Sequence, residues 1–315
     1  MTAVELPGTD VSVRCADFSR QIRLDPGGTA FAVDEIIVAD VPLPWPKPIF
    51  AGDGLTAVPA LVERARDHGR RVRVLGAVPV EHGDGRVVVH SRGYVGDPRF
   101  GRVEHRVAPD LVPELLEALL VDGLGSVPET EAEVDTFAAE VLVCTQGSHD
   151  LCCGSIGTRF ALDIEAARPD VLVRRVSHTG GHRFAPTGVT LPDGRMWGML
   201  DIDQMLGILD RSVRPSSVAD RCRGWTGAAM GPAQVAERAV FSLVDDWEFD
   251  DRPRQVEVVE ENDGRARVLV GGFEWWWEVD VSVAREVPTI KCGAPGGLPL
   301  KPGREYRVDD VRVVS

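Results

Sequence analysis

Two short segments of the chain hold most of the residues that could bind a metal. Cys144 is followed by eight residues and then by Cys153, and a second segment reads His178-Thr179-Gly180-Gly181-His182. Thiolates and imidazoles are the protein ligands that zinc and iron centres use most. Three of the six cysteines, Cys144, Cys152 and Cys153, lie within ten residues. We therefore predict one metal centre formed by Cys144, either Cys152 or Cys153, His178 and His182.

The glycines between the two histidines bear on the kind of metal. On an α-helix His178 and His182 would share one face, as in helical zinc sites, but each glycine inside a helix costs about 1 kcal/mol. We therefore expect a loop, in which glycine allows positive φ and close approach to a bulky group. Structural zinc sites commonly separate paired ligands by two to four residues. A structural Cys2His2 zinc site remains an alternative, and a metal-free dithiol site would leave the histidines without a role.

The elements around these residues should bring the two segments together. The run Val141–Val143 predicts a buried strand that leads into Cys144, and 171–176 predicts the next strand. Ile156, Phe160 and Ile164 indicate a helix between them, with Cys153 just before its start. Because successive strands of an α/β unit place their connecting loops at one sheet edge, the cysteines and histidines should meet there. The positive end of the helix dipole should stabilise the Cys153 thiolate.

The element order occurs twice along the chain. Residues 35–41, 55–65, 72–78, 87–90 and 111–119 predict strand, helix, strand, strand and helix. The second round runs from 141 through a hairpin at Pro192-Asp193-Gly194 to a helix from about 201. This repetition predicts an α/β fold with two thioredoxin-like units, of which the first is degenerate and lacks ligands. We expect domains at 1–125 and 126–212, followed at 213–315 by a helix and a small C-terminal β appendage.

Composition limits the functional classes. With 35 basic and 49 acidic residues the net charge is -14, which argues against a nucleic-acid-binding surface. The start of the chain lacks a basic segment followed by an apolar run, and we find no stretch of about 18 apolar residues. We expect a cytoplasmic protein that does not bind membranes. Clustered cysteines in such a chain favour metal or redox chemistry over a disulfide framework.

The ligand segments also resemble a known family. CTQGSHDLCCGSIG (144–157) and SHTGGHRFAPTGVTLPDGRMWGMLD (177–201) look like the sucrase/ferredoxin-like family, and CADFSR (15–20) resembles its N-terminal start. That family is similar to thioredoxin-like 2Fe-2S ferredoxins, which have a widely spaced cysteine pair and a second pair separated by three residues. The resemblance implies that His178 and His182 replace the second pair as an HxxxH motif. It also favours Cys153 over Cys152 as ligand, because Cys153 lies four residues before Gly157.

The resemblance implies a 2Fe-2S cluster-binding electron-transfer or redox protein with two cysteine and two histidine ligands. Histidine ligation of one iron would give a moderate reduction potential. The physiological partner, a reductase or oxygenase, is unknown, and an oxidoreductase that reduces a small molecule at the cluster is the alternative. No carboxylate pair stands out for glycoside hydrolysis. His149, Arg159 and Arg183 are expected to tune the cluster, and Cys15, Cys222 and Cys292 to be structural.

Overall fold

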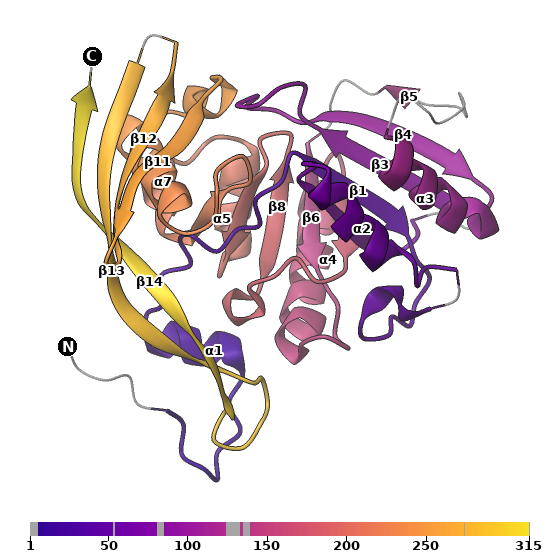
Figure 1. The fold of residues 1–315 in the computed structure, drawn as a ribbon. Helices are drawn as coiled ribbons and strands as arrows, with labels where there is room; N and C mark the ends of the chain where they lie inside the picture. Colours follow the sequence, from indigo (N-terminus) through magenta and orange to yellow (C-terminus); the bar gives the residue numbers. More distant parts are fainter. Residues whose placement is uncertain are drawn as a thin grey trace.

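Two β-sheets with helices packed around them make up the chain (Figure 1). The computed structural model describes residues 6–52, 54–80, 85–123, 133–134, 139–273 and 275–314. The elements before residue 139 are α1 (Cys15–Gln21), β1 (Glu35–Asp40), η1 (Ile49–Ala51), α2 (Val58–Asp67), β2 (Val72–Ala77), β3 (Gly85–Ser91), β4 (Gly101–Val107), η2 (Pro109–Leu111), α3 (Val112–Asp122) and β5 (Glu133–Val134).

The second part of the chain continues the larger sheet and then forms the smaller one. Its elements are β6 (Glu140–Cys144), η4 (Cys153–Gly157), α4 (Thr158–Ala167), β7 (Leu172–Val176), η5 (His182–Phe184), β8 (Thr187–Leu191), β9 (Arg195–Gly198), α5 (Ile202–Leu209), α6 (Pro215–Val218), η6 (Ala219–Arg221), β10 (Cys222–Trp225), α7 (Pro232–Val244), η7 (Trp247–Asp251), β11 (Gln255–Asn262), β12 (Arg265–Gly272), β13 (Trp275–Ile290) and β14 (Pro299–Val314).

The larger sheet has ten strands in the order β10-β9-β8-β6-β7-β2-β1-β3-β4-β5. Its two halves share one topology: β1 pairs parallel with β2 and antiparallel with β3, as β6 pairs parallel with β7 and antiparallel with β8. The hairpins β3-β4 and β8-β9 extend the two halves outward. The halves meet at β2 and β7, where Ala77 is opposite Val176. The predicted repetition of element order therefore corresponds to two similar half-sheets.

The mixed α/β class was predicted, whereas the joining of both halves into one sheet was not. Four of the described strands were also missed: β4 and β5 in the first half, β10 at the far edge of the second, and β14 in the C-terminal sheet. The assignment of each half as a thioredoxin-like unit stays a prediction. The expected boundary between residues 125 and 126 lies outside the described residues. Among the described residues, no helix is both long enough and apolar enough to cross a membrane.

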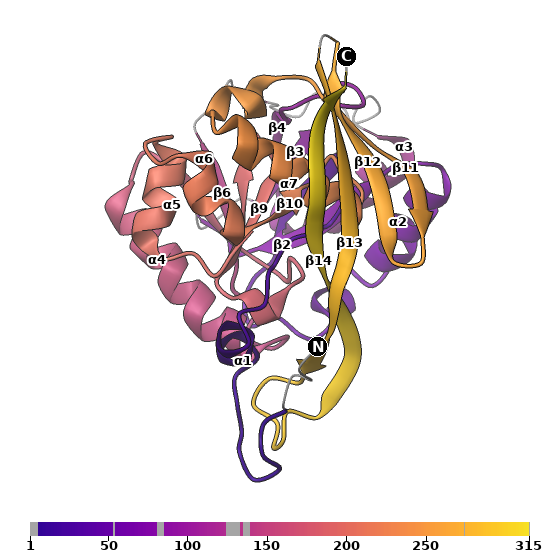
Figure 2. The same ribbon diagram turned by 90° about the vertical axis from the view of Figure 1, so that its left-hand side faces the viewer.

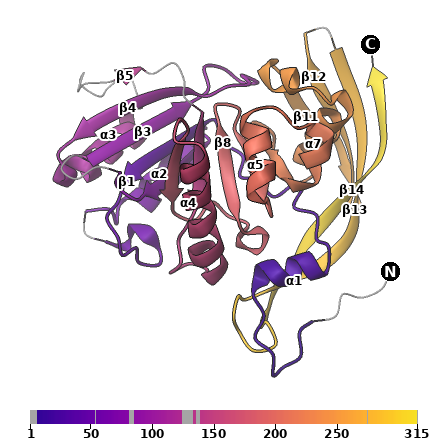
Figure 3. The same cartoon turned by 180° about the vertical axis from the view of Figure 1, so that it is seen from behind.

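The C-terminal sheet, in the order β11-β12-β13-β14, is antiparallel and, over the residues that the structure describes, makes no ladder with the larger sheet. It nevertheless shares a hydrophobic core with it, because Val141 and Phe160 belong to the same buried cluster as Val240 and Val268. In Figures 2 and 3, α7 lies between the strands of the larger sheet and this C-terminal sheet. The expected division at residue 213 stays a prediction, and the β appendage packs closely against the second half.

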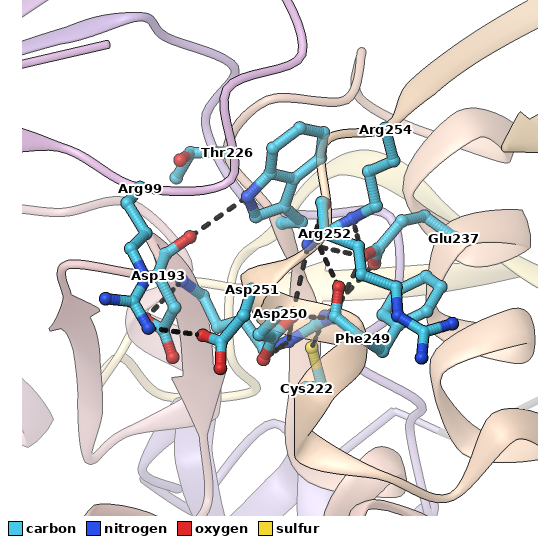
Figure 4. A network of polar contacts seen from close by, with 12 residues as sticks. Arg99, Asp193, Cys222, Thr226, Glu237, Phe249, Asp250, Asp251, Arg252 and Arg254 are labelled. Carbon is cyan, nitrogen blue, oxygen red and sulfur yellow. Dashed lines mark hydrogen bonds and ion pairs between the residues drawn. The ribbon is translucent and has the colours of Figure 1, made fainter. Parts of the chain in front are cut away.

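A buried ionic network joins the same parts of the chain (Figure 4). Arg195 of β9 and Arg254 before β11 each pair with Glu237 of α7 and Asp250 of η7, at 2.6–3.1 Å. All four side chains have no exposed surface. The guanidinium of Arg195 also lies 3.6 Å from the ring centre of Phe241. Two cations and two anions compensate one another, so removing one charge would leave another buried and unpaired.

We expect Glu237→Gln to lower the free energy of unfolding by about 3–5 kcal/mol, the usual effect of breaking a buried pair. Denaturant unfolding followed by circular dichroism would measure it. Asp163→Asn is a matched control, because Asp163 pairs with Arg159 on the surface of α4. Such an exposed pair should contribute less than about 1 kcal/mol. Equal stability of the two variants would contradict the assigned role of the network.

Candidate metal centre

Two parallel strands deliver the first cysteine and the first histidine to one edge of the sheet. Cys144 is the last residue of β6 and lies opposite Val176, the last residue of β7. His178 follows β7 by two residues. The carboxyl ends of parallel strands share a sheet edge, so both side chains emerge at the same place, as the sequence predicted.

The second cysteine comes from the start of the helix that connects these strands. Helical structure begins at Leu151, so Cys153 lies within the first turn rather than just before the helix as predicted. The side chain of Asp150 accepts the backbone N–H of Cys152 at 2.8 Å and so caps this end. Residues 153–157 form a single π-turn, a distortion frequent at functional sites. A Cβ on Gly157 would lie 2.0 Å from the carbonyl oxygen of Cys144, so only glycine lets the helix approach β6 here.

Three potential ligand atoms gather at this edge. The sulfur atoms of Cys144 and Cys153 and a ring nitrogen of His178 all lie within 4.8 Å of one another. Both cysteines are at most 1% exposed. The hydrogen bond from the Cys153 thiol, followed by one from His178, holds the pKa of Cys144 well below its usual range despite burial. The backbone amide of Thr179 supports the same thiolate. The site therefore favours a thiolate at Cys144. The expected stabilisation of a Cys153 thiolate is not found, because the hydrogen bond to Cys144, burial and the charge of Cys144 raise the pKa of Cys153.

The segment from His178 to His182 is a loop, as the glycines predicted. Gly180 and Gly181 have φ values of +79° and +67°, and η5 begins only at His182. A Cβ on Gly181 would also lie 2.5 Å from the guanidinium of Arg223, which packs beneath the loop. The Arg223 Nη1 donates to the carbonyl of Gly180 at 3.1 Å. A buried cation thus holds the backbone of the loop in place.

His182 lies further from the two cysteines than His178 does. Its ring centre is 5.9 Å from that of His178, and it is outside the group of three close donors. Its Nδ1 lies 2.9 Å from the Asp150 carboxylate and 3.2 Å from the Cys15 sulfur. Burial raises the pKa of Asp150, but the hydrogen bond and charge of His182 outweigh it and lower that pKa to about 2. Asp150 therefore orients the ring of His182 by holding Nδ1.

Of the three flanking residues expected to tune the site, His149 contacts the ring of His178. Its ring stacks on that of His178 with a centre separation of 3.7 Å. Burial, together with His178 and Lys47, lowers the pKa of His149 to about 4, so this imidazole is neutral at pH 7. Arg159 instead points to solvent and pairs with Asp163. The guanidinium of Arg183 stacks on Phe184, and burial lowers its pKa.

Sequence comparison identifies the family to which this part of the chain belongs. A family model described as sucrase/ferredoxin-like matches residues 35–224, more than half of the chain. The chain belongs to the sucrase/ferredoxin-like family. The match begins at β1 and ends within β10, so it spans the ten-stranded sheet and includes Cys144, Cys153, His178 and His182. Searches among curated proteins and among solved structures found no match.

Two further cysteines lie outside the part that matches the sucrase/ferredoxin-like family, and sequence reasoning missed their arrangement. Cys15, at the start of α1, and Cys292, after β13, meet Cys152 and Asp150 beside the histidine loop. Figures 1 and 2 show α1 close to the end of the hairpin at which β13 ends and β14 begins. These cysteines are 277 residues apart, so no local spacing could reveal the group. Cys222, by contrast, is buried in the core and contacts Arg195.

Proposed function

We propose that the protein binds one 2Fe-2S cluster through Cys144, Cys153, His178 and His182 and works as an electron-transfer protein. The proposal is supported above all by the group formed by Cys144, Cys153 and His178 in a member of the sucrase/ferredoxin-like family. When bound, such a cluster supplies reversible one-electron transfer.

The residues present fit this cofactor. Nδ1 of His178 is buried and has no hydrogen-bond partner within the part of the chain that the structure describes. A buried polar atom without a partner is costly, and a metal bond to the imidazole would compensate that cost. His182 lies further from the two cysteines than His178 does. This position suits a cluster of two irons, because ligands bound to different irons need not be as close together as ligands bound to one ion. Histidine pairs replace cysteine pairs on one iron in Rieske centres.

The exposure of the ligands favours a carrier. The cysteines are buried, whereas 26% of the His182 side chain remains accessible. Electrons would therefore enter or leave on the histidine side. A cavity of about 950 Å³ beside the glycine loop is lined by four cations, Arg73, Arg183, Lys301 and Arg304, and by one anion, Glu286. These cations would attract acidic side chains of a redox partner protein such as a reductase or oxygenase.

A second candidate function is reduction of a small molecule at the cluster. It is favoured by a cavity of about 310 Å³ that is lined by His149 and His178, with Glu63 and Arg66 at its wall. Turnover of a small substrate by the isolated protein with a chemical reductant would favour this enzyme over the carrier.

A cytoplasmic location belongs to the same proposal, since all six cysteines are unpaired, as expected in a reducing compartment.

We expect protein purified without oxygen to contain about two irons and two acid-labile sulfides per chain, the content of one 2Fe-2S cluster. Metal analysis, sulfide determination and the visible absorption spectrum would measure this content. A Cys222→Ser variant is the control, because Cys222 lies in the apolar core and should leave the iron content unchanged. Zinc bound by Cys144, Cys153 and His178 in place of iron would overturn the proposed function.

A further inference from the structure

The group formed by Cys15, Asp150, Cys152 and Cys292 has the geometry of a closed single-ion site. The sulfur of Cys152 lies 3.7 Å from that of Cys15 and 3.3 Å from that of Cys292. The Cys15 sulfur is 3.7 Å from Oδ1 of Asp150, and the ligand atoms of all four residues lie within 4.8 Å of one another. Zinc–sulfur bonds of about 2.3 Å in a tetrahedron place neighbouring sulfur atoms about 3.8 Å apart. The observed edges are close to that value.

Burial makes this group costly without a cation. Cys15, Cys152 and Asp150 are 1%, 0% and 7% exposed. Oδ1 of Asp150 accepts the backbone N–H of Cys152 at 2.8 Å, which holds the carboxylate beside the three sulfur atoms. Backbone amides also point at sulfur: the N–H of Ala16 supports Cys152, and that of Cys15 lies 3.5 Å from the Cys292 sulfur. Amide donors and clustered anions suit thiolate ligands of a metal.

We propose that Cys15, Cys152, Cys292 and Asp150 bind one structural zinc ion, distinct from the proposed 2Fe-2S centre. Three thiolates and one carboxylate complete a tetrahedral site with no open position. The two groups differ in their fourth donor: here all four ligand atoms lie close enough to surround one ion, whereas His182 lies outside the close set at the proposed 2Fe-2S centre.

The ion would connect three segments that are distant in sequence. It would fix α1 and the loop after β13 to the first turn of the helix that carries Cys153. Asp150 would bind zinc through one oxygen, while its Oδ2 lies 2.9 Å from Nδ1 of His182. A carboxylate shared in this way orients the imidazole and fixes which ring nitrogen is free to bind another metal. The zinc site would thereby position a proposed iron ligand.

Zinc and iron analysis of the full-length protein and its variants tests this proposal. We expect about one zinc per chain in the wild type, and at least a tenfold lower zinc content in Cys292→Ser with the iron content retained. Cys292 suits this test because it is the least buried of the three cysteines and is not among the proposed iron ligands. Cys222→Ser is the matched control and should keep both metals.

A second measurement is independent of whether Cys292→Ser folds. Wild-type protein that retains its iron should be stripped of zinc by a chelator and titrated with Co²⁺. One equivalent should give the visible bands of tetrahedral cobalt and the charge-transfer bands of several thiolate ligands. An octahedral cobalt spectrum, a wild type without zinc, or a Cys152–Cys292 disulfide in anaerobically purified protein would overturn the zinc site. Loss of iron alone would contradict only the proposed function.

Discussion

Replacing Cys153 with serine should remove at least nine-tenths of the iron and of the visible cluster absorption, whereas Cys152→Ser should keep most of both. The reason is that these adjacent side chains face different groups. The Cys153 sulfur lies with Cys144 and His178, and the Cys152 sulfur lies with Cys15 and Cys292. A cluster that loses a thiolate ligand loses a metal bond, for which a serine hydroxyl is a poor substitute at neutral pH.

The same two variants should show the reverse pattern for zinc. Cys152→Ser should lose zinc and keep iron, and Cys153→Ser should lose iron and keep zinc. Cys144→Ser should behave like Cys153→Ser, which provides a second test of the iron site. Iron, zinc and sulfide analysis of all variants, purified without oxygen, would show which metal each variant loses. If Cys152→Ser loses the iron and Cys153→Ser retains it, the ligand must be reassigned to Cys152.

The elements around the ligands could be predicted from the sequence because their signals are local. Apolar runs ending at Cys144 and Val176 defined two buried strands, and Asp193-Gly194 defined the β8-β9 hairpin. The prediction that these strand ends meet needed only the parallel pairing of an α/β unit. Gly180 and Gly181 correctly indicated a loop with positive φ rather than a helix.

The missed strand β4 shows where pattern reading fails. Its sequence, GRVEHRV, carries charges at Arg102, Glu104 and Arg106 that look like a solvent-exposed segment. In the structure Glu104 is buried and pairs with both arginines. Compensation of charge by charge permits polar residues in a sheet, and such partners are known only once the tertiary structure is known.

The second cysteine group could not be predicted for a related reason. Cys152 was weighed as a rival to Cys153 for one iron and as a partner of Cys144 in a metal-free dithiol site, and Cys15 and Cys292 were regarded as structural. The contacts between α1, the helix start at Leu151 and the loop after β13 depend on how the C-terminal sheet packs, which no local periodicity encodes. Adjacent residues in the first turn of a helix point in directions roughly 100° apart, so the sulfur atoms of Cys152 and Cys153 can lie in two different groups.

Replacing both His178 and His182 with cysteine should lower the midpoint potential by on the order of a few hundred millivolts, the difference between Rieske and plant-type centres. Each substitution exchanges a neutral imidazole for a thiolate and so adds one negative charge beside the cluster. Added negative charge opposes electron uptake, and the potential falls. Each single variant should lie between the wild type and the double variant, and protein-film voltammetry would measure all four.

The pH dependence of the potential tests the same ligands. A ligand imidazole keeps one ring nitrogen that can hold a proton, and reduction favours holding it because negative charge is added. Raising the pH removes these protons and so disfavours reduction. The wild-type potential should therefore fall over the range in which the ligand imidazoles titrate, by up to about 59 mV per pH unit for each coupled proton.

The double cysteine variant should have a flat profile over that range, because it has no ligand imidazole left to titrate. His149→Gln is the matched control, since His149 stacks on His178 but is not a proposed ligand, and it should keep the slope. A slope that survives in the double variant would assign the proton to another group. A wild-type potential that does not change with pH would lead us to reject proton-coupled transfer. Either His178 and His182 would then not be ligands, or contacts such as that of Asp150 with Nδ1 of His182 would hold the proton over the whole pH range.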